Sequence, residues 1–267
     1  MSAADFKLTT PVVSTHELGL SFGIDANRHE VLADVNVTIA PGEFLCVVGP
    51  TGCGKSSLLN LLAGLIPPTT GEVRVGGDVL RGLNPVAGYL LQGDALLPWR
   101  TARDNIALGL QFRGATRLAA HSAADRWLAR VGLADAAHRH PHALSGGMKK
   151  RVALAQVLAV DPRLLLLDEP FSALDVQTRA LMEAELLRLW TEERRSVVFI
   201  THDLEEAIAL GDRVLVMSAG PGSRPIAEFP IDLPRPRAVE EIRLTAEFLA
   251  LRRQIWRLLK DEIRVAR

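Results

Sequence analysis

The sequence contains little cysteine, carries no net charge and lacks a long apolar run. Its 267 residues include only two cysteines, Cys46 and Cys53, which cannot build a disulfide framework or a cysteine zinc site. The 31 basic residues balance the 31 acidic ones, which argues against a strongly basic nucleic-acid binder and an acidic disordered tail. No segment approaches the roughly 20 apolar residues of a membrane-spanning helix, and the N-terminus does not resemble a signal peptide. We therefore expect a soluble chain of the cytoplasm.

Strand and helix patterns alternate along most of the chain. Apolar and polar residues alternate at 12–22 and 31–39, as in half-buried strands. The apolar run at 43–49 is typical of a strand buried on both faces. Further strands are predicted at 72–75, 86–91, 163–168, 196–200 and 213–217, and helices at 55–65, 176–193 and 204–210. This order predicts an α/β fold with a mostly parallel sheet and an N-terminal antiparallel β portion.

Two further regions interrupt or follow this alternation. Residues 101–160 have a helical pattern with no clear strand, so we expect an inserted helical subdomain at about 94–160 within a domain at 12–220. A proline-rich connector at 233–237 begins the last part of an extension at 221–267. An amphipathic helix is predicted at 238–265 with the apolar residues Ile242, Leu249, Trp256, Leu259 and Ile263. From Ala238 to the end of the sequence there are seven basic and five acidic residues. This excess is too small for a membrane anchor, so we expect the helix to pack on the protein's own surface.

The segment GPTGCGKS at 49–56 fits the phosphate-loop pattern G-x-x-x-x-G-K-[ST]. Its glycines allow backbone N–H groups to wrap phosphate oxygens, and the helix that follows directs its positive end at them. Lys55 supplies a charge to the terminal phosphates, and Ser56 supplies a hydroxyl to Mg²⁺. A chance glycine-rich turn is the alternative. We expect the nucleotide to contact Gly49, Pro50, Thr51, Gly52, Cys53, Gly54, Lys55, Ser56 and Ser57.

Two carboxylates follow a run of four leucines in LLLLDEP at 164–170. Ligands of parallel sheets bind at the carboxyl ends of strands. Asp168 is therefore placed to hold Mg²⁺, and Glu169 to polarise a water against the terminal phosphate. Taken alone, the pair could also be a helix N-cap.

Six motifs occur in a fixed order: the phosphate loop, Gln92, LSGG at 144–147, the pair at 168–169, SALD at 172–175 and TH at 201–202. This order resembles the ATPase subunit of ABC transporters over about residues 12–220. The resemblance implies a P-loop NTPase fold, hydrolysis of MgATP and a head-to-tail dimer with a second copy of the chain. Met148 stands where that family most often has glutamine.

The resemblance also implies roles for single residues. Phe22 would stack on adenine, although a strand aromatic in the core is the alternative. Gln92 would reach Mg²⁺ and the attacking water from the hinge of the helical subdomain. His202 would contact the terminal phosphate, and Asp175 would link the two sites of the dimer. Serving the partner's nucleotide would fall to Ser145, Gly146 and Gly147.

Longer stretches, at 90–110, 164–179 and 217–222, are similar to ATPase subunits of nitrate, sulfonate and taurine importers. This similarity implies membrane permease subunits as partners, an extracytoplasmic solute-binding protein acting indirectly, no nucleic acid, and a peripheral position on the cytoplasmic face of the inner membrane. Alternatives are an importer of a pyrimidine vitamin precursor, a lipid-trafficking or export ATPase, and a soluble ABC ATPase without a transport role.

Large apolar residues gather just past the hinge, at Leu96, Leu97, Pro98 and Trp99. They have no obvious core there, so this segment is interpreted as a socket for a helix of the membrane partner. The alternative is that Trp99 fills the small core of the helical subdomain itself.

Overall fold

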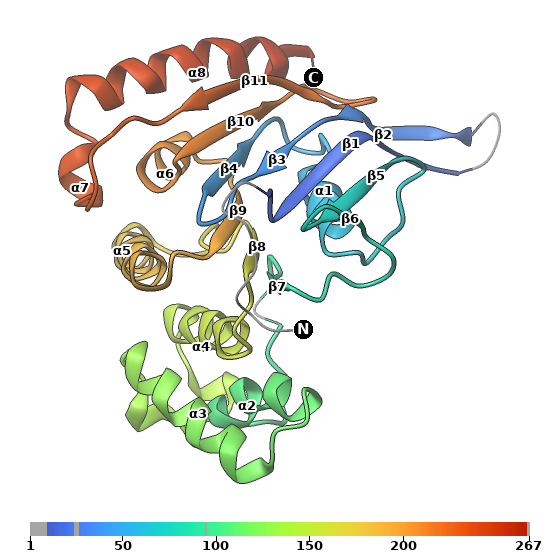
Figure 1. Cartoon of the computed structure of the whole chain (residues 1–267). Coiled ribbons are helices and arrows are strands. Elements are labelled where there is room, and N and C mark those ends of the chain that lie inside the picture. Colours follow the sequence, from blue (N-terminus) through green and yellow to red (C-terminus); the bar gives the residue numbers. More distant parts are fainter. Residues whose placement is uncertain (1–9, 24–26, 94, 266–267) are drawn as a thin grey trace.

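The centre of the molecule is a six-stranded sheet in the order β11-β10-β4-β9-β8-β7 (Figure 1). The computed structural model describes residues 10–23, 27–93 and 95–265. Within the sheet, β4, β7, β8, β9 and β10 run parallel, and only β11 is antiparallel to its neighbour. The strands are β4 (Phe44–Val48), β7 (Ala87–Leu90), β8 (Leu164–Asp168), β9 (Ser196–Ile200), β10 (Arg213–Met217) and β11 (Pro225–Pro230). The predicted α/β class is confirmed.

Alternate residues of the buried strands enter two different cores. In β4, Phe44, Cys46 and Val48 belong to a core formed with the helical subdomain and the later helices. Leu45 and Val47 belong to a second core with α1 (Lys55–Leu62) and the N-terminal strands. All five residues of β4 are buried, as predicted for this run. Successive side chains of a strand point to opposite faces of the sheet, so each face receives every second residue of the strand.

The N-terminal portion is a separate antiparallel sheet in the order β2-β1-β5-β6, with β3 also paired to β1. Its strands are β1 (Val13–Phe22), β2 (His29–Val35), β3 (Thr38–Ile39), β5 (Thr70–Val75) and β6 (Asp78–Val79). The single strand predicted at 31–39 is wrong, because the chain breaks between β2 and β3. Asp34 has a positive φ of 47°, and the Asn36 side chain bonds Asp34 at 2.6 Å and accepts from the Glu17 N–H at 2.8 Å. These contacts turn the chain and end the ladder.

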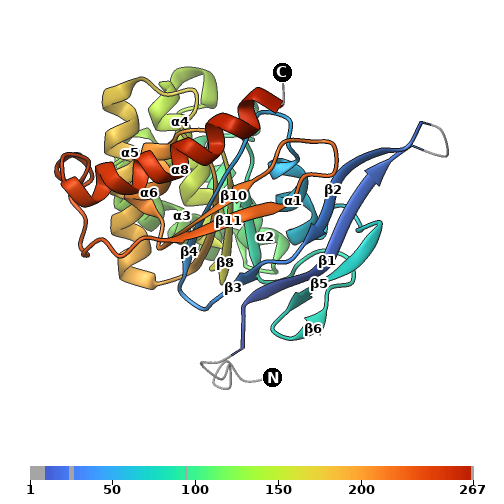
Figure 2. The same ribbon diagram turned by 90° about the horizontal axis from the view of Figure 1, so that it is seen from above.

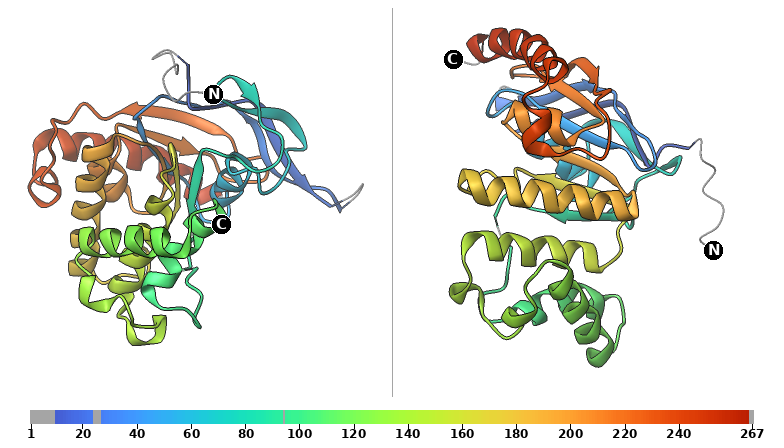
Figure 3. Two further views of the ribbon diagram at one scale, coloured as in Figure 1. Left: turned by 60° about the horizontal axis from the view of Figure 1, so that its bottom comes forward. Right: turned by 90° about the vertical axis from the view of Figure 1, so that its left-hand side faces the viewer.

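The helical subdomain contains α2 (Ala102–Phe112), α3 (Arg117–Arg130) and α4 (Gly146–Ala159). The three helices gather at the end of the molecule away from the N-terminal sheet (Figure 1, and Figure 3 at right). Each begins at a hydroxyl N-cap, supplied by Thr101, Thr116 and Ser145. Two short 3₁₀ turns, Ala134–Ala136 and Pro141–Ala143, join α3 to α4.

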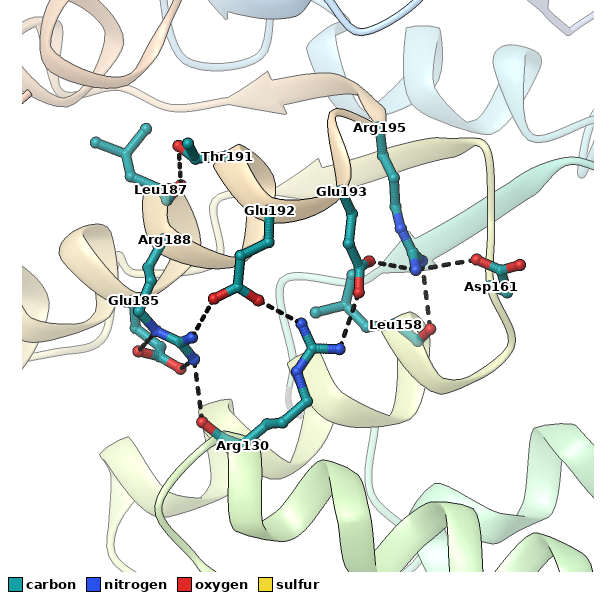
Figure 4. Close-up of polar contacts among 10 residues, drawn as sticks. All are labelled: Arg130, Leu158, Asp161, Glu185, Leu187, Arg188, Thr191, Glu192, Glu193 and Arg195. Carbon is teal, nitrogen blue, oxygen red and sulfur yellow. Dashed lines mark hydrogen bonds and ion pairs between the residues drawn. The ribbon is translucent and has the colours of Figure 1, made fainter. Parts of the chain in front are cut away.

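An ion-pair network joins this subdomain to α5 (Val176–Glu193) of the main body (Figure 4). Arg130 at the end of α3 contacts Glu192 at 2.7 Å and Glu193 at 2.8 Å. Arg188 on α5 pairs with Glu192 at 2.6 Å and donates to the Arg130 carbonyl at 3.1 Å. These side chains are partly exposed, so each pair contributes little alone, but shared partners link the contacts into one network.

The C-terminal extension continues the main sheet before it becomes helical. Its first element, β11, was not predicted from the sequence, where prolines at 225 and 230 obscure a strand at the sheet edge. Next, α7 (Val239–Ile242) and α8 (Ala246–Val265) follow the proline-rich connector, and α8 lies across α6 (Leu204–Leu210) and the β10–β11 pair (Figure 2). Within the described residues, no helix has both the length and the apolar content needed to cross a membrane.

The single helix predicted at 238–265 is wrong, because it is broken between α7 and α8. The hydroxyl of Thr245 donates to the Ile242 carbonyl at 2.8 Å and accepts from the Phe248 N–H at 3.3 Å, which ends one helix and starts the next. The break changes which face is buried: Phe248, Ile255 and Leu259 pack inward, whereas 51% of Trp256 is exposed. Packing on the protein's own surface is confirmed.

Candidate active site

The phosphate-loop segment connects β4 to α1 and has the backbone that its glycines allow. Gly52 and Gly54 have φ values of 80° and 91°, a region that L side chains rarely adopt. A Cβ on Gly54 would also lie 2.9 Å from Val31 and Leu32 side chains. Lys55 is 7% exposed, and its Nζ donates to the carbonyls of Gly49 and Pro50 at 2.9 Å each. The cation is therefore held over the loop.

Ser56 and Asp168 meet although they lie in distant parts of the sequence. The Ser56 hydroxyl, at the start of α1, donates to Asp168 Oδ1 at the end of β8 over 3.1 Å. Asp168 is 6% exposed. Burial raises the pKa of its carboxyl, and the Ser56 hydrogen bond partly opposes this rise. A hydroxyl and a carboxylate at this separation match the oxygen ligands that a hard divalent cation prefers.

Glu169 is the centre of a second cluster beside this pair. Its backbone has a φ of 44°, which turns the chain out of β8 directly after Asp168. Gln92 Nε2 donates to Glu169 Oε2 at 3.3 Å, and His202 Nδ1 lies 3.4 Å from the same oxygen. The structure thus brings together three of the four residues predicted to be catalytic, from the turn after β8, the hinge after β7 and the loop after β9.

Both clusters open into one cavity of about 520 Å³. Lys55, Gln92, Glu169 and His202 line it together with Val31, Thr51, Gly52, Gly54, Ser56 and Ser57. A larger hollow of about 690 Å³ lies near Pro41 and Arg195, at the amino ends of the strands. The first cavity holds the predicted groups at the carboxyl ends of the strands, where parallel sheets bind ligands.

Some predicted nucleotide contacts lie outside the lining of this cavity. Pro50 and Cys53 are buried residues of the loop itself, and burial raises the pKa of the Cys53 thiol despite nearby Lys55. Phe22 ends β1 with 52% of its surface exposed. Its exposure rules out the core alternative for this ring.

The LSGG and SALD segments each begin a helix outside the cavity. Ser145 Oγ accepts from the Met148 N–H at 3.3 Å at the start of α4. Asp175 Oδ1 accepts from the Thr178 N–H at 3.0 Å at the start of α5, and this bonding lowers the pKa of the Asp175 carboxyl. A Cβ on Gly147 would lie 2.6 Å from the Thr178 methyl group. The glycine therefore lets the two helix starts approach each other.

The sequence patterns missed two contributors. Val31 lines the cavity from β2, and its position depends on a sheet pairing that the local pattern does not reveal. Lys150 on α4 is 4% exposed and donates to the Gln92 carbonyl at 3.0 Å. In the sequence Lys150 is the middle one of three consecutive basic residues, which gives no signal that it is buried.

The chain is similar to known proteins over most of its length. The family model described as ABC transporter matches residues 32–172. An ATP-binding protein of Brucella abortus is 49% identical over 83% of this chain and 85% of its own length. The nitrate import ATP-binding protein NrtD of Synechococcus elongatus is 42% identical over 82% of each chain. The taurine import ATP-binding protein TauB of Escherichia coli K12 is 41% identical over 86% of this chain and 92% of its own.

The fold also matches a solved structure of a dimeric ATP-binding cassette in a post-hydrolysis state, bound to ADP and phosphate. The TM-score is 0.73 and the sequence identity is 31%, over 83% of this chain and all of the other.

Proposed function

The chain belongs to the ABC transporter family and is an ATPase, and on this basis we propose that it hydrolyses MgATP in the cavity between the phosphate loop and Glu169 to energise an importer. One observation carries the proposal: Gln92 and His202 both contact the Glu169 carboxylate, in a cavity that Lys55 also lines. Such a grouping provides a charge for phosphate and a base for water in one place.

Binding of ATP begins with the phosphates. Backbone N–H groups of the loop and the start of α1 face them, and Lys55 supplies the cation. Phe22, exposed at the end of β1, is available to stack on the adenine ring. Because Lys55 already rests over the loop, little rearrangement is needed to bring its charge to the terminal phosphates.

Ser56 and Asp168 would hold Mg²⁺, with the Gln92 side chain close by. The pair fits this ion, because its hydroxyl and carboxylate oxygens already lie 3.1 Å apart. When bound, Mg²⁺ neutralises charge on the phosphate oxygens.

Glu169 would polarise the attacking water and accept its proton as oxygen bonds to the terminal phosphorus and the bond to ADP breaks. His202 would fix the orientation of Glu169 and contact the terminal phosphate. Gln92 would hold the water from its other side. The contacts that Glu169 makes at 3.3 Å and 3.4 Å support this division of roles.

The second half of each site would come from another copy of the chain. Ser145, Gly146, Gly147 and Asp175 lie outside the lining of the described cavity, with the LSGG and SALD helix starts side by side at Gly147 and Thr178. A head-to-tail dimer would place this surface over the partner's phosphates. The dimeric state of the similar cassette supports the arrangement.

Transport requires partners in the membrane. We assign residues 12–220 to the ATPase domain, with the subdomain at about 94–160, and 221–267 to an extension. The chain would sit on the cytoplasmic face of the inner membrane against permease subunits. An extracytoplasmic binding protein would deliver the solute to the permease. The names of the nitrate and taurine relatives support a small oxyanion or sulfonate as the solute.

Glu169→Gln tests the proposed chemistry. We expect turnover to fall at least about a hundredfold, because the amide cannot accept the proton, whereas calorimetry should still detect MgATP binding. Glu247→Gln, on the exposed surface of α8, is the matched control. Turnover near the parental rate in Glu169→Gln would refute the assignment.

Uptake tests the proposed direction and solute. The chain is reconstituted with its permease and binding protein in vesicles, and uptake of labelled nitrate, taurine and an alkyl sulfonate is compared. ATP-dependent accumulation of one of these supports the proposal, and ATP-dependent extrusion would contradict it.

A further inference from the structure

The helix α6 starts at Leu204, two residues after His202. Asp203 caps it by accepting from the N–H groups of Glu205 at 2.8 Å and Glu206 at 3.3 Å. With only seven residues, α6 is too short to be stable by itself. Its neighbours therefore fix its position, and with it the position of His202.

The C-terminal end of α6 is held by the proline-rich connector. Arg237 is 9% exposed, and its Nη1 donates to the carbonyls of Ala209 at 3.1 Å and Gly211 at 2.6 Å. Its Nη2 donates to the Ile231 carbonyl at 3.1 Å. Burial lowers the pKa of Arg237 to about 10, so the guanidinium remains charged at neutral pH. It supplies donors and a positive charge where the last helical carbonyls lack partners.

Arg235 of the same connector strengthens this end. Its Nη2 donates to the Leu210 carbonyl at 2.8 Å and to Asp212 Oδ1 at 2.7 Å. The guanidinium also lies 4.3 Å from the centre of the Trp190 ring, a favourable cation–π distance. The connector is therefore attached to α6 and to α5 together.

A buried carboxylate of α5 binds the extension. Glu183 on α5 is 0% exposed, and Arg243, directly after α7, donates to its two oxygens at 2.9 Å and 3.1 Å. Glu183 acts electrostatically on Glu206 of α6 and raises its pKa, after the larger effect of burial. Arg243 thus neutralises one of two neighbouring buried carboxylates.

Glu206 contacts the loop that carries His202. Thr201, immediately before His202, donates its hydroxyl to Glu206 Oε2 at 2.6 Å and accepts from the Asp203 N–H at 2.9 Å. Arg179 lies 3.6 Å from Glu206 and 3.4 Å from Asp203. The backbone on both sides of His202 is therefore attached to a charged group that includes Arg179 of α5. Glu183 lies one helical turn after Arg179, so the pair that it forms with Arg243 adjoins this group.

We propose that the C-terminal extension is a brace that holds the C-terminal end of α6 through Arg237 and the adjoining α5 through Arg243, and so sets the position of His202, with both arginines as positioning residues. The proposal rests on the function proposed for His202. It extends that function to residues 233–243, outside the part of the chain that the family model matches. Helix α8, lying across α6 (Figure 2), completes the brace with a surface ion pair between Arg252 and Glu205 at 3.1 Å.

Arg243→Met and Arg237→Met test the brace in the full-length chain, with Arg253→Met on the exposed face of α8 as the control. We expect kcat to fall about tenfold in both variants, since small misplacement of a catalytic group is costly, while KM for ATP stays within about twofold. Arg243→Lys should recover part of the loss, because it restores the charge opposite Glu183. Unchanged kcat in both variants would overturn the proposal.

A spectroscopic readout separates positioning from a general loss of stability. Histidine-labelled protein gives imidazole resonances by NMR, and His202→Gln identifies that of His202. We expect Arg243→Met to shift the His202 signal and Arg253→Met to leave it in place. A His202 signal that does not move in Arg243→Met would overturn the brace, whatever the activity.

Two further variants keep the test decisive. If Arg243→Met does not fold because Glu183 is left buried and unpaired, the double variant with Glu183→Gln removes both charges and should still lower kcat and shift the His202 signal. If His202→Gln retains full activity, the proposed role of His202 fails. The shift of the His202 resonance in Arg243→Met then still tests whether the extension sets the position of His202.

Discussion

The hydroxyl of Ser56 donates to the carboxylate of Asp168 across 3.1 Å, although 112 residues separate them in the sequence. One residue begins a helix and the other ends a strand, so their meeting depends on the sheet order rather than on local pattern. The two oxygens converge where the proposed Mg²⁺ site requires them.

Asp168→Asn should therefore raise the Mg²⁺ concentration that supports half-maximal ATPase activity, by at least about tenfold. The amide keeps a similar size but removes the charge that attracts the cation. A magnesium titration of ATPase activity checks this, with Asp135→Asn on the surface as control. An unchanged titration would remove Asp168 from the metal site.

Lys55→Ala should weaken MgATP binding itself by at least about tenfold, because a charge-assisted contact to the phosphates disappears. It also removes the hydrogen bonds that Nζ makes to the carbonyls of Gly49 and Pro50. Titration calorimetry is the measurement, and Lys260→Ala in α8 is the control. Equal affinity for the parent and Lys55→Ala would contradict the phosphate-loop assignment.

Ser145→Arg should leave ATP binding by one subunit intact and prevent closure of the dimer, because the arginine occupies the surface that meets the partner's phosphates. Mixed with Lys55→Ala, it places both defects in one composite site and leaves the other whole. Some ATPase activity should return in the mixture. Activity no higher than that of either variant alone would count against two independently working shared sites.

Trp99→Ala should preserve the ATPase activity of the isolated subunit but abolish stimulation by the assembled transporter. The side chain is 72% exposed, so it does not fill the core of the helical subdomain. Its loop is held in place by buried Asn105, whose side chain bonds the N–H and carbonyl of Leu97 at 2.7 Å and 3.2 Å. Thermal melting should change little, since an exposed substitution costs within about 0.5 kcal/mol; a large loss of stability would contradict the socket.

Glu206→Gln should flatten the dependence of stability on pH. Burial, opposed in part by the Thr201 hydrogen bond, raises the pKa of Glu206 from 4.5 to about 7. Between these values the folded chain holds the proton more tightly than the unfolded chain, so the free energy of unfolding falls as pH rises through this range. The loss is on the order of 3 kcal/mol.

Urea unfolding at pH 5 and pH 8 measures this difference. The stability of Glu206→Gln relative to the parent should increase at the higher pH, and Glu205→Gln should follow the parent. Parallel losses in parent and Glu206→Gln would assign the pH dependence to other groups.

The sequence predicted the phosphate loop, Asp168 and the main strands because each depends on short-range pattern: four leucines in succession, or glycines at fixed spacing. It did not predict the break at Asp34, because that break depends on a tertiary hydrogen bond between Asn36 and Glu17. The sequence pattern also predicts Trp256 on the apolar face of one continuous helix. The break at Thr245 changes the phase of the helix, and this side chain is half exposed.

Arg237 illustrates what local pattern cannot supply. In the sequence it ends the proline-rich segment LPRPR at 233–237, which is typical of an exposed connector. Its burial arises because the carbonyls that end α6 happen to lie opposite it. Only the three-dimensional path of the chain reveals that these acceptors need a cation.

The prolines that bound β11 also limit how the molecule can associate. This strand forms one outer edge of the main sheet, and exposed sheet edges are common sites of uncontrolled pairing between chains. Proline has no N–H, so positions 225 and 230 offer no donor to an additional strand. The described edge at β11 therefore resists continuation of the sheet into a neighbouring molecule, and aggregation by strand addition is disfavoured there.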